Sequence, residues 1–284
     1  LLEDVPLEQV LKSPTSYGMP ILFPYAGRVG PGDLKDAQSH FTWEGKRYVV
    51  EPSRHGLVRH LPWEVLDSGE SHCVCRTAVK SPANADLFPF FFTMEVSYRF
   101  SEAGLTVRAS AYNLGNSFPY TFGLHPYLNR FPDTTGITAA TLKVPAASRW
   151  ELCNHIPSGK LLAADREYNL RVGHWLDRLF PGRDLWRSSY DDVFTELQPD
   201  AAGNVTCEVA RADGDVTRLS FAVADYPHVC VYTPPRRQAI CVEPFTGAPD
   251  AFNHSDDPRF GLRVLPAGKN VWFGPVTIGY HHGR

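Results

Sequence analysis

Apolar and polar residues alternate with a period of two wherever the chain is regular, which is typical of β-strands with one buried face. The clearest alternation runs over residues 92–100 and returns over 105–111, with Ser-Glu-Ala-Gly as a four-residue turn between them. This pattern predicts a β-hairpin. Three further hairpins are predicted over residues 41–50, 205–223 and 262–280. In the 205–223 hairpin the alternation slips once around Arg218, which predicts a β-bulge at that point.

Helical periodicity is weak by comparison, because only segments around 161–179 and 183–190 could form a helical turn or two. Strands that alternate with long helices are absent from the pattern, which excludes a parallel sheet. The chain is therefore predicted to be all-β, a large β-sandwich of two packed antiparallel sheets with few short helices. Residues 1–284 are expected to form a single domain, with residues 1–20 irregular or trimmed. Irregular connections are expected at 24–40, 51–63, 125–136 and 243–260.

The composition narrows the choice of function. Lys and Arg number 28 against 31 Asp and Glu, and this net charge of −3 gives no electrostatic attraction to nucleic acid or to an anionic membrane. No apolar run is long enough for a transmembrane helix, and the first residues lack the basic and apolar regions of a signal peptide. The six cysteines are too sparse for a disulfide scaffold. We therefore expect reduced cysteines and a cytoplasmic protein without nucleic-acid or membrane partners.

Several catalytic signatures are absent from the sequence. The glycine-rich segment 27–32 lacks the Gly-x-Gly-x-x-Gly spacing, and the chain has no Walker A, Gly-x-Ser-x-Gly or His-Glu-x-x-His sequence. Cys73 and Cys75 would share one face of a strand, whereas paired zinc ligands usually have two residues between them. The pattern favours packing over metal binding for these cysteines and for the Cys153-Asn154-His155 segment. No metal site is predicted.

Titratable side chains gather where predicted strands give way to loops rich in glycine, proline and aromatic residues. Four such clusters lie at residues 54–60, 122–129, 190–194 and 241–245. Two imidazoles with carboxylates and aromatic rings suit reversible proton transfer on a polyol that stacks on rings. Each side chain also has a purely structural interpretation, as a satisfied core histidine, a carboxylate at a strand end, a solvated turn or a surface arginine.

Five segments, taken in order, resemble the motifs of the aldose 1-epimerase (galactose mutarotase) family. They are Arg28 within Pro-Tyr-Ala-Gly-Arg-Val, His55-Gly56, Gly123-Leu124-His125-Pro126-Tyr127, Asp191-Asp192-Val193-Phe194, and Glu243-Pro244 with the later Pro249-Asp250-Ala251. Together these segments span nearly the whole chain. The resemblance implies a large β-sandwich that acts as an isomerase, interconverting the α and β anomers of an aldose without a cofactor or a metal.

The resemblance also implies a role for individual side chains. Glu243 would be the base at the C1 hydroxyl and His125 the acid at the ring oxygen, on opposite sides of one sugar. His55 would stabilise the charge that develops on the ring oxygen. Arg28 and Asp191 would bind sugar hydroxyls through charge-assisted hydrogen bonds.

Further substrate-binding residues are expected to be Arg59, Tyr127, Trp63 and Phe245, with the aromatic rings as walls of the pocket. Asp191 is chosen over its neighbour Asp192 by counting back from Phe194, so the structure has to decide which of the two faces the sugar. The base must be ionised and the acid imidazole protonated near neutral pH. We therefore expect the burial of the acid and the base to be incomplete.

Two alternatives remain open. The first is a hexose-6-phosphate mutarotase, because residues 55–63 resemble a shorter bacterial branch of the family that includes such enzymes. It predicts a basic cluster at the pocket, drawn from Arg28, Arg54, Arg59 and Lys80, although the small net charge favours a neutral free sugar. The second is a non-catalytic carbohydrate-binding or sensing module, since a fold does not determine an activity. In each case the partner is a small-molecule aldose, and the chain is expected to be a monomer or a homodimer.

Overall fold

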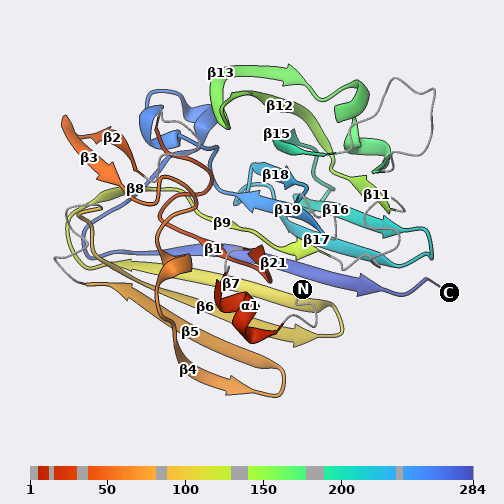
Figure 1. The fold of residues 1–284 in the computed structure, drawn as a ribbon, viewed down its shortest axis with the longest axis horizontal. Helices are drawn as coiled ribbons and strands as arrows, with labels where there is room; N and C mark the ends of the chain where they lie inside the picture. Colours follow the sequence, from red (N-terminus) through yellow and green to blue (C-terminus); the bar gives the residue numbers. More distant parts are fainter. Residues whose placement is uncertain are drawn as a thin grey trace.

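The protein is described by a computed structural model that covers residues 6–12, 16–30, 38–80, 88–128, 140–176, 189–234 and 239–283. Regular structure in these ranges is almost entirely antiparallel β, in two large sheets that form the two layers of a sandwich (Figure 1). The predicted all-β sandwich is confirmed. The described α-helical structure is α1 (Leu7–Lys12), and no helix in the described ranges has the length and apolar character needed to cross a bilayer.

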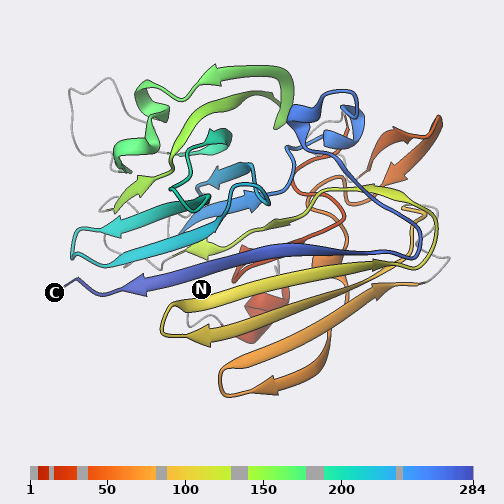
Figure 2. The ribbon, with the colours of Figure 1, turned by 180° about the vertical axis from the view of Figure 1, so that it is seen from behind.

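One layer is a nine-stranded sheet. Its order is β14 (His174–Trp175), β11 (Ala140–Lys143), β16 (Asn204–Arg211), β17 (Val216–Ala222), β21 (Asn270–His281), β7 (Gly104–Asn113), β6 (Phe92–Ser101), β5 (His72–Val79) and β4 (Glu64–Gly69). Seen from behind, the long blue strand β21 runs through the middle of this layer, between β17 and β7 (Figure 2). A strand from the C-terminal end of the chain therefore joins the two halves of this sheet, β14 to β17 and β7 to β4.

The other layer is an eight-stranded sheet that supplies most of the cavity described below. Its order is β1 (Ile21–Leu22), β9 (Gly123–Leu124), β19 (Ile240–Phe245), β18 (His228–Tyr232), β15 (Asp191–Leu197), β12 (Ala146–Cys153) and β13 (Ile156–Ala163), with β10 (Tyr127–Leu128) also paired to β19. Two small ladders complete the strands, β2 (Ser39–Trp43) with β3 (Lys46–Val50) and β8 (Phe118–Tyr120) with β20 (Arg263–Leu265).

Single 3₁₀ turns lie between the strands, at Val58–His60, Arg166–Tyr168, Leu170–Val172, Ala251–Asn253 and Pro258–Phe260. Two of them fall in the 161–179 segment, where a helical turn or two was expected, although that segment begins inside β13. Of the 183–190 segment, residues 183–188 lie outside the described residues.

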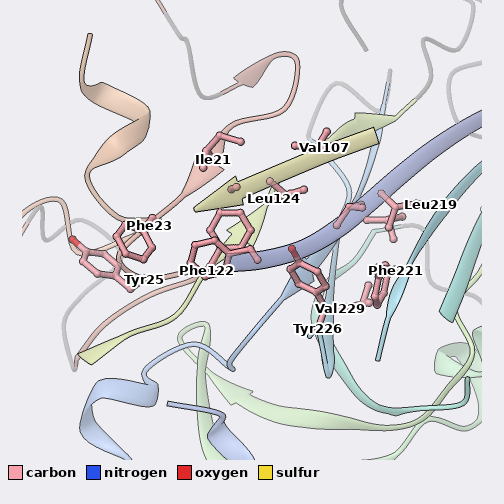
Figure 3. Packing of buried hydrophobic residues seen from close by; sticks show 14 of the residues in the cluster. Ile21, Phe23, Tyr25, Val107, Phe122, Leu124, Leu219, Phe221, Tyr226 and Val229 are labelled. Carbon is pink, nitrogen blue, oxygen red and sulfur yellow. The ribbon is translucent and has the colours of Figure 1, made fainter. Parts of the chain in front are cut away.

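The core lies between the sheets, where aromatic side chains of both layers meet (Figure 3). Phe23, just after β1, packs edge-on against Phe92 of β6 with 4.9 Å between ring centroids. Phe122 stacks on Phe273 of β21 with 4.0 Å between centroids. Full burial of such a ring stabilises the fold by about 1.5–3 kcal/mol relative to exposure. These contacts anchor the two loop segments that follow β1 and flank β9, which carry side chains of the cavity.

The hairpins at 92–111 and 41–50 are confirmed. Strands β6 and β7 pair throughout, but their ladder extends to Ser101 and Gly104, so the turn has two residues rather than the four expected. Strands β2 and β3 pair Phe41 with Tyr48 across a turn whose two residues, Glu44 and Gly45, have φ of 48° and 75°. Positive φ at both central positions matches the twist of a two-residue hairpin turn.

Two expectations about strand pairing are wrong. Strands β16 and β17 pair in one unbroken register from Asn204 to Ala210, so there is no bulge at Arg218. Thr217 is buried on the core-facing side instead, and the apparent slip is a polar residue at an inward position. The predicted hairpin at 262–280 does not form, because β20 pairs with β8, whereas β21 pairs with β7 and β17.

Candidate active site

A cavity of about 170 Å³ lies against the eight-stranded sheet, beside strands β10, β15, β18 and β19 and under the loops that follow β1 and β3. Eight of the nine predicted site residues line it, namely Arg28, His55, Arg59, His125, Tyr127, Asp191, Glu243 and Phe245. Trp63 does not line it. Its indole nitrogen donates a hydrogen bond to the Val58 carbonyl oxygen, and its ring packs against the core. The fold thus brings residues more than 200 positions apart to one cavity.

His125 and Glu243 are in direct contact, with 3.2 Å between His125 Nε2 and Glu243 Oε1. Glu243 lies within β19, paired on one side with Cys230 of β18. The His125 backbone is fixed by the hydrogen bond that its N–H donates to the Pro20 carbonyl oxygen. The two groups therefore share one side of the cavity, rather than the opposite sides that the sequence led us to expect.

The burial of this pair is nearly complete, with residue exposures of 6% for His125 and 1% for Glu243, which corrects the expectation of partial burial. Desolvation lowers the pKa of His125 to about 3. It also raises the pKa of Glu243 well above its ordinary value, with a further increase from the nearby Asp191 carboxylate. Burial thus disfavours an isolated charge on either partner. One proton held jointly keeps the pair neutral overall, whether that proton lies on the carboxyl or on the imidazole.

His55 stands beside this pair, with 5.4 Å between its ring centroid and that of His125. Its backbone is in the left-handed region at φ 65°, and its N–H donates a hydrogen bond to the Gly27 carbonyl oxygen. Gly56 continues the turn at φ 71°, where a Cβ would collide with the backbone of Phe23. Desolvation, followed by the neighbouring His125, lowers the pKa of His55. This tight turn aims an uncharged imidazole at the catalytic candidates.

Arginine side chains form a basic edge of the cavity. Arg59 Nη2 donates a hydrogen bond to the Arg54 carbonyl oxygen, and both residues line the cavity together with the buried Arg28. Burial, and then the like charge of Arg54, lowers the pKa of Arg59 to about 10. Among the described residues neither Arg54 nor Arg59 has a carboxylate partner within ion-pair distance, and Arg59 Nε is buried without a hydrogen-bond partner. Lys80, the other expected member of a basic cluster, does not line the cavity.

The two adjacent aspartates differ in position. Asp191 lines the cavity, whereas Asp192 is buried at 5% exposure and its Oδ2 accepts a hydrogen bond from the Asp191 backbone N–H. His155, from the turn between β12 and β13, also lines the cavity and approaches Asp191, with 2.9 Å between Nδ1 and Oδ2. His155 was considered in the sequence only as part of a possible metal-binding segment and not as a cavity residue, because its place at the cavity depends on how that hairpin packs.

Aromatic rings and sulfur complete the lining. Tyr127 stacks on the His125 ring at 4.9 Å between centroids, and Phe245 lies two residues beyond Glu243. The side chain of Cys230 reaches the cavity as well. His125, Cys241 and Glu243 each offer a ligand atom, and these three atoms lie within 4.8 Å of one another, as a metal site would require.

Comparison with known proteins places the chain in a defined group. It is 25% identical over 262 residues to the uncharacterized protein YihR of Escherichia coli K12, covering 88% of this chain and 75% of that relative. A galactose mutarotase-like protein of Clostridium acetobutylicum shares the fold at a TM-score of 0.79 and 19% identity, over 99% of this chain and 84% of that one. A GalM/aldose epimerase homologue of C. elegans gives a TM-score of 0.79 at 15% identity, over 100% and 88% of the two chains. The family model for aldose 1-epimerase matches residues 1–273, and with this match the chain belongs to the aldose 1-epimerase family.

Proposed function

We propose that the protein is a mutarotase that interconverts the α and β anomers of an aldose by acid and base catalysis. The observation that carries this proposal is the contact between His125 and Glu243 at a cavity, with His55 beside it. Anomer exchange requires one proton to leave the C1 hydroxyl and another to reach the ring oxygen. These two oxygens are bonded to the same carbon, so a contacting acid and base can serve both.

The reaction starts when the Glu243 carboxylate removes the proton from the C1 hydroxyl and the His125 imidazolium donates a proton to the ring oxygen. The bond between C1 and the ring oxygen breaks while the C1 carbonyl forms, giving the open-chain aldehyde. Rotation about the C1–C2 bond and reversal of both proton transfers close the other anomer. The reactive form of the pair has a Glu243 carboxylate and a His125 imidazolium, and the fully neutral form differs from it only in the position of one proton. That proton moves between two atoms that lie 3.2 Å apart.

The remaining side chains hold the sugar. Asp191 and Arg28 offer an acceptor and donors for ring hydroxyls, and charge-assisted hydrogen bonds of this kind are the stronger ones. His55 lies close enough to His125 to donate to the ring oxygen as negative charge develops there. Phe245 and Tyr127 supply apolar surface against which the faces of the sugar pack.

Polarimetry on freshly dissolved α-D-glucose and α-D-galactose tests the proposal. The protein should bring the rotation to equilibrium faster than buffer alone, and Glu243→Gln should lower kcat by about 10²–10⁴-fold, the usual contribution of general acid–base catalysis. Glu208→Gln on β16, in the other sheet, is the matched control and should leave kcat unchanged. If no sugar equilibrates faster than in buffer, the enzyme proposal fails. Sugar binding without turnover would then identify a non-catalytic binding module.

A sugar with an anionic substituent is the second candidate substrate, and the Arg54 and Arg59 pair favours it. Burial, and then the like charge of Arg54, lowers the pKa of Arg59, and neither guanidinium has a carboxylate partner among the described residues, so a phosphate between the two groups would relieve their repulsion. With glucose 6-phosphate, Arg59→Ala should raise KM by about tenfold or more, whereas with glucose it should have little effect. Arg76→Ala on the exposed face of β5 is the control. Equal loss with both sugars would remove the support for an anionic substrate.

A further inference from the structure

Three potential metal ligands converge at one side of the cavity, where His125 and Glu243 line it and Cys241 lies buried beside them. Cys241 and Glu243 are two residues apart on β19 and therefore face the same way, and Cys241 pairs with Tyr127 of β10, two residues after His125. The ligand atoms of His125, Cys241 and Glu243 lie within 4.8 Å of one another, and all three residues are buried. Glu243 Oε2 and His125 Nδ1 are buried without hydrogen-bond partners among the described residues. The cluster thus has unused ligand capacity.

The donor set fits a thiophilic divalent cation. Zinc bonds of about 2.0–2.3 Å in tetrahedral geometry place neighbouring ligand atoms roughly 3.3–3.8 Å apart. The 3.2 Å between His125 Nε2 and Glu243 Oε1 is already close to that spacing. One imidazole, one thiolate and one carboxylate leave the fourth coordination position of a tetrahedral ion open. For an ion that enters through the cavity, this open position would face the cavity.

Charge supports the same conclusion. A thiolate and a carboxylate would together neutralise the two charges of the cation, at the expense of releasing their protons. The positive charges of Arg54 and Arg59, which line the same cavity, repel a free cation. Once the cation is bound by a thiolate and a carboxylate, the site carries no net charge and this repulsion disappears.

We propose that His125, Cys241 and Glu243 form an inhibitory site for a thiophilic divalent cation such as Zn²⁺. The ion would be bound by both members of the acid and base pair, so it would block turnover rather than assist it. Binding itself depends only on the three ligands; the inhibitory consequence rests on the proposed function. Cys241 has no part in the proton transfers, so its removal separates the metal site from the reaction.

Co²⁺ absorption provides a direct probe, because a cobalt–thiolate bond gives a charge-transfer band that oxygen and nitrogen ligands do not. Cys73 and Cys75 on β5 have to be replaced first, since their sulfurs lie 3.5 Å apart and could bind the probe themselves. Exposed Cys153 is replaced with them. In the resulting Cys73→Ser, Cys75→Ser, Cys153→Ser protein, the titration should saturate at one thiolate-bound Co²⁺ per chain.

Two cysteine variants in this background decide the assignment. Cys241→Ala should abolish the band, whereas Cys207→Ala, which removes an equally buried thiol from β16, should retain it. Cys241→Ser is measured in parallel, with circular dichroism to verify folding, and should weaken Co²⁺ affinity by about tenfold or more. A band that survives in folded Cys241→Ala or Cys241→Ser protein, or the absence of a saturable band in the background protein, would overturn the proposal.

Activity then tests the inhibitory consequence. Zn²⁺ should slow anomer exchange reversibly, with recovery on adding a chelator, and Cys241→Ala should keep its activity while losing sensitivity to Zn²⁺ by about tenfold or more. Inhibition that persists unchanged in Cys241→Ala would contradict the site. If the protein proved inactive on every sugar, the cobalt band would still decide the metal site, so failure of the two proposals can be distinguished.

Discussion

His155 contacts Asp191 at the wall of the cavity, with 2.9 Å between the imidazole Nδ1 and the carboxylate Oδ2. The histidine is held out by a two-residue turn in which Asn154 and His155 both have positive φ, at 52° and 64°. The hairpin of β12 and β13 thereby brings a side chain from the edge of the sheet to a carboxylate on β15. The partner of a predicted sugar ligand thus comes from a segment without a recognisable motif.

His155→Ala should raise KM for the sugar by up to about fivefold with kcat nearly unchanged, because the contact orients Asp191 but is about one-third to one-half exposed. Steady-state polarimetry measures both constants. The control is His72→Ala, which removes a similar exposed pair, His72 with Asp67, from the other sheet. A fall in kcat without a change in KM would contradict a role in binding.

The two adjacent aspartates should respond differently to the same substitution. Asp191→Asn is expected to raise KM and leave the free energy of unfolding within about 0.5 kcal/mol, since its side chain is partly exposed in the cavity. Asp192→Asn is expected to lower the free energy of unfolding by about 1–2 kcal/mol with KM unchanged, because its buried carboxylate accepts a backbone hydrogen bond. Kinetics and urea unfolding on both variants provide the comparison, and a reversed pattern would show that Asp192 faces the sugar.

Gly56→Ala should be among the most damaging small substitutions near the site. The new Cβ would collide with the Phe23 backbone at a position with φ 71°, so we expect a loss of about 3 kcal/mol or more in unfolding free energy. Gly45→Ala is a matched control, because φ there is 75° and a Cβ has open space, and it should cost only about 1 kcal/mol. Equal losses would mean that dihedral strain, not the close approach beneath His55, restricts position 56 to glycine.

His228 should contribute to loss of stability in acid. It pairs with Phe245 inside the eight-stranded sheet, and burial lowers the pKa of His228 from 6.5 to about 4. Between these values the unfolded chain binds a proton that the folded protein does not, so stability falls as pH decreases from about 6.5 to 4 and this contribution is constant below that. The full effect is about 3 kcal/mol.

Urea unfolding of the protein and of His228→Gln at pH 7 and at pH 4.5 measures this effect. The loss between the two pH values should be smaller in the variant by about 2–3 kcal/mol, and other titrating groups cancel in the difference. Identical losses in the two proteins would show that the imidazole is not held neutral by burial.

Local patterns predicted strands well and strand partners poorly. The alternation at 92–111 and 41–50 identified hairpins because consecutive strands joined by a short turn usually pair. The same reasoning failed at 262–280, where a long central strand binds two partners that are distant in sequence. Alternation shows which face is buried, but it contains no information on which strand lies alongside. The bulge predicted at Arg218 was wrong for a related reason, since a threonine such as Thr217 can occupy an inward position without a change of register.

The residues of the cavity were likewise predicted from local motifs, but the contacts between them were not. Motifs with recognisable spacing, such as those of His55, His125 and Glu243, were predicted individually, and the fold brings them together. Direct contact between His125 and Glu243, and the depth of their burial, depend on the register of β10 and β19 and could not be inferred from spacing. Trp63 was expected in the pocket because of its neighbours in sequence, but its indole points to the Val58 carbonyl.

Strand β19 is bounded by β18 on one side and by β9 and β10 on the other, so the backbone that carries Glu243 has ladders on both flanks. Local opening of that backbone would break both ladders at once, and amide hydrogens there should exchange only in the rarest openings of the molecule. The backbone around His55 belongs to no such ladder and is held by two isolated bridges, Phe23 with Gly56 and Arg28 with Arg54, and by the hydrogen bonds around them to the loop after β1. Amide exchange should therefore be faster around His55 than around Glu243, so the carboxylate is the more rigidly held of the two side chains.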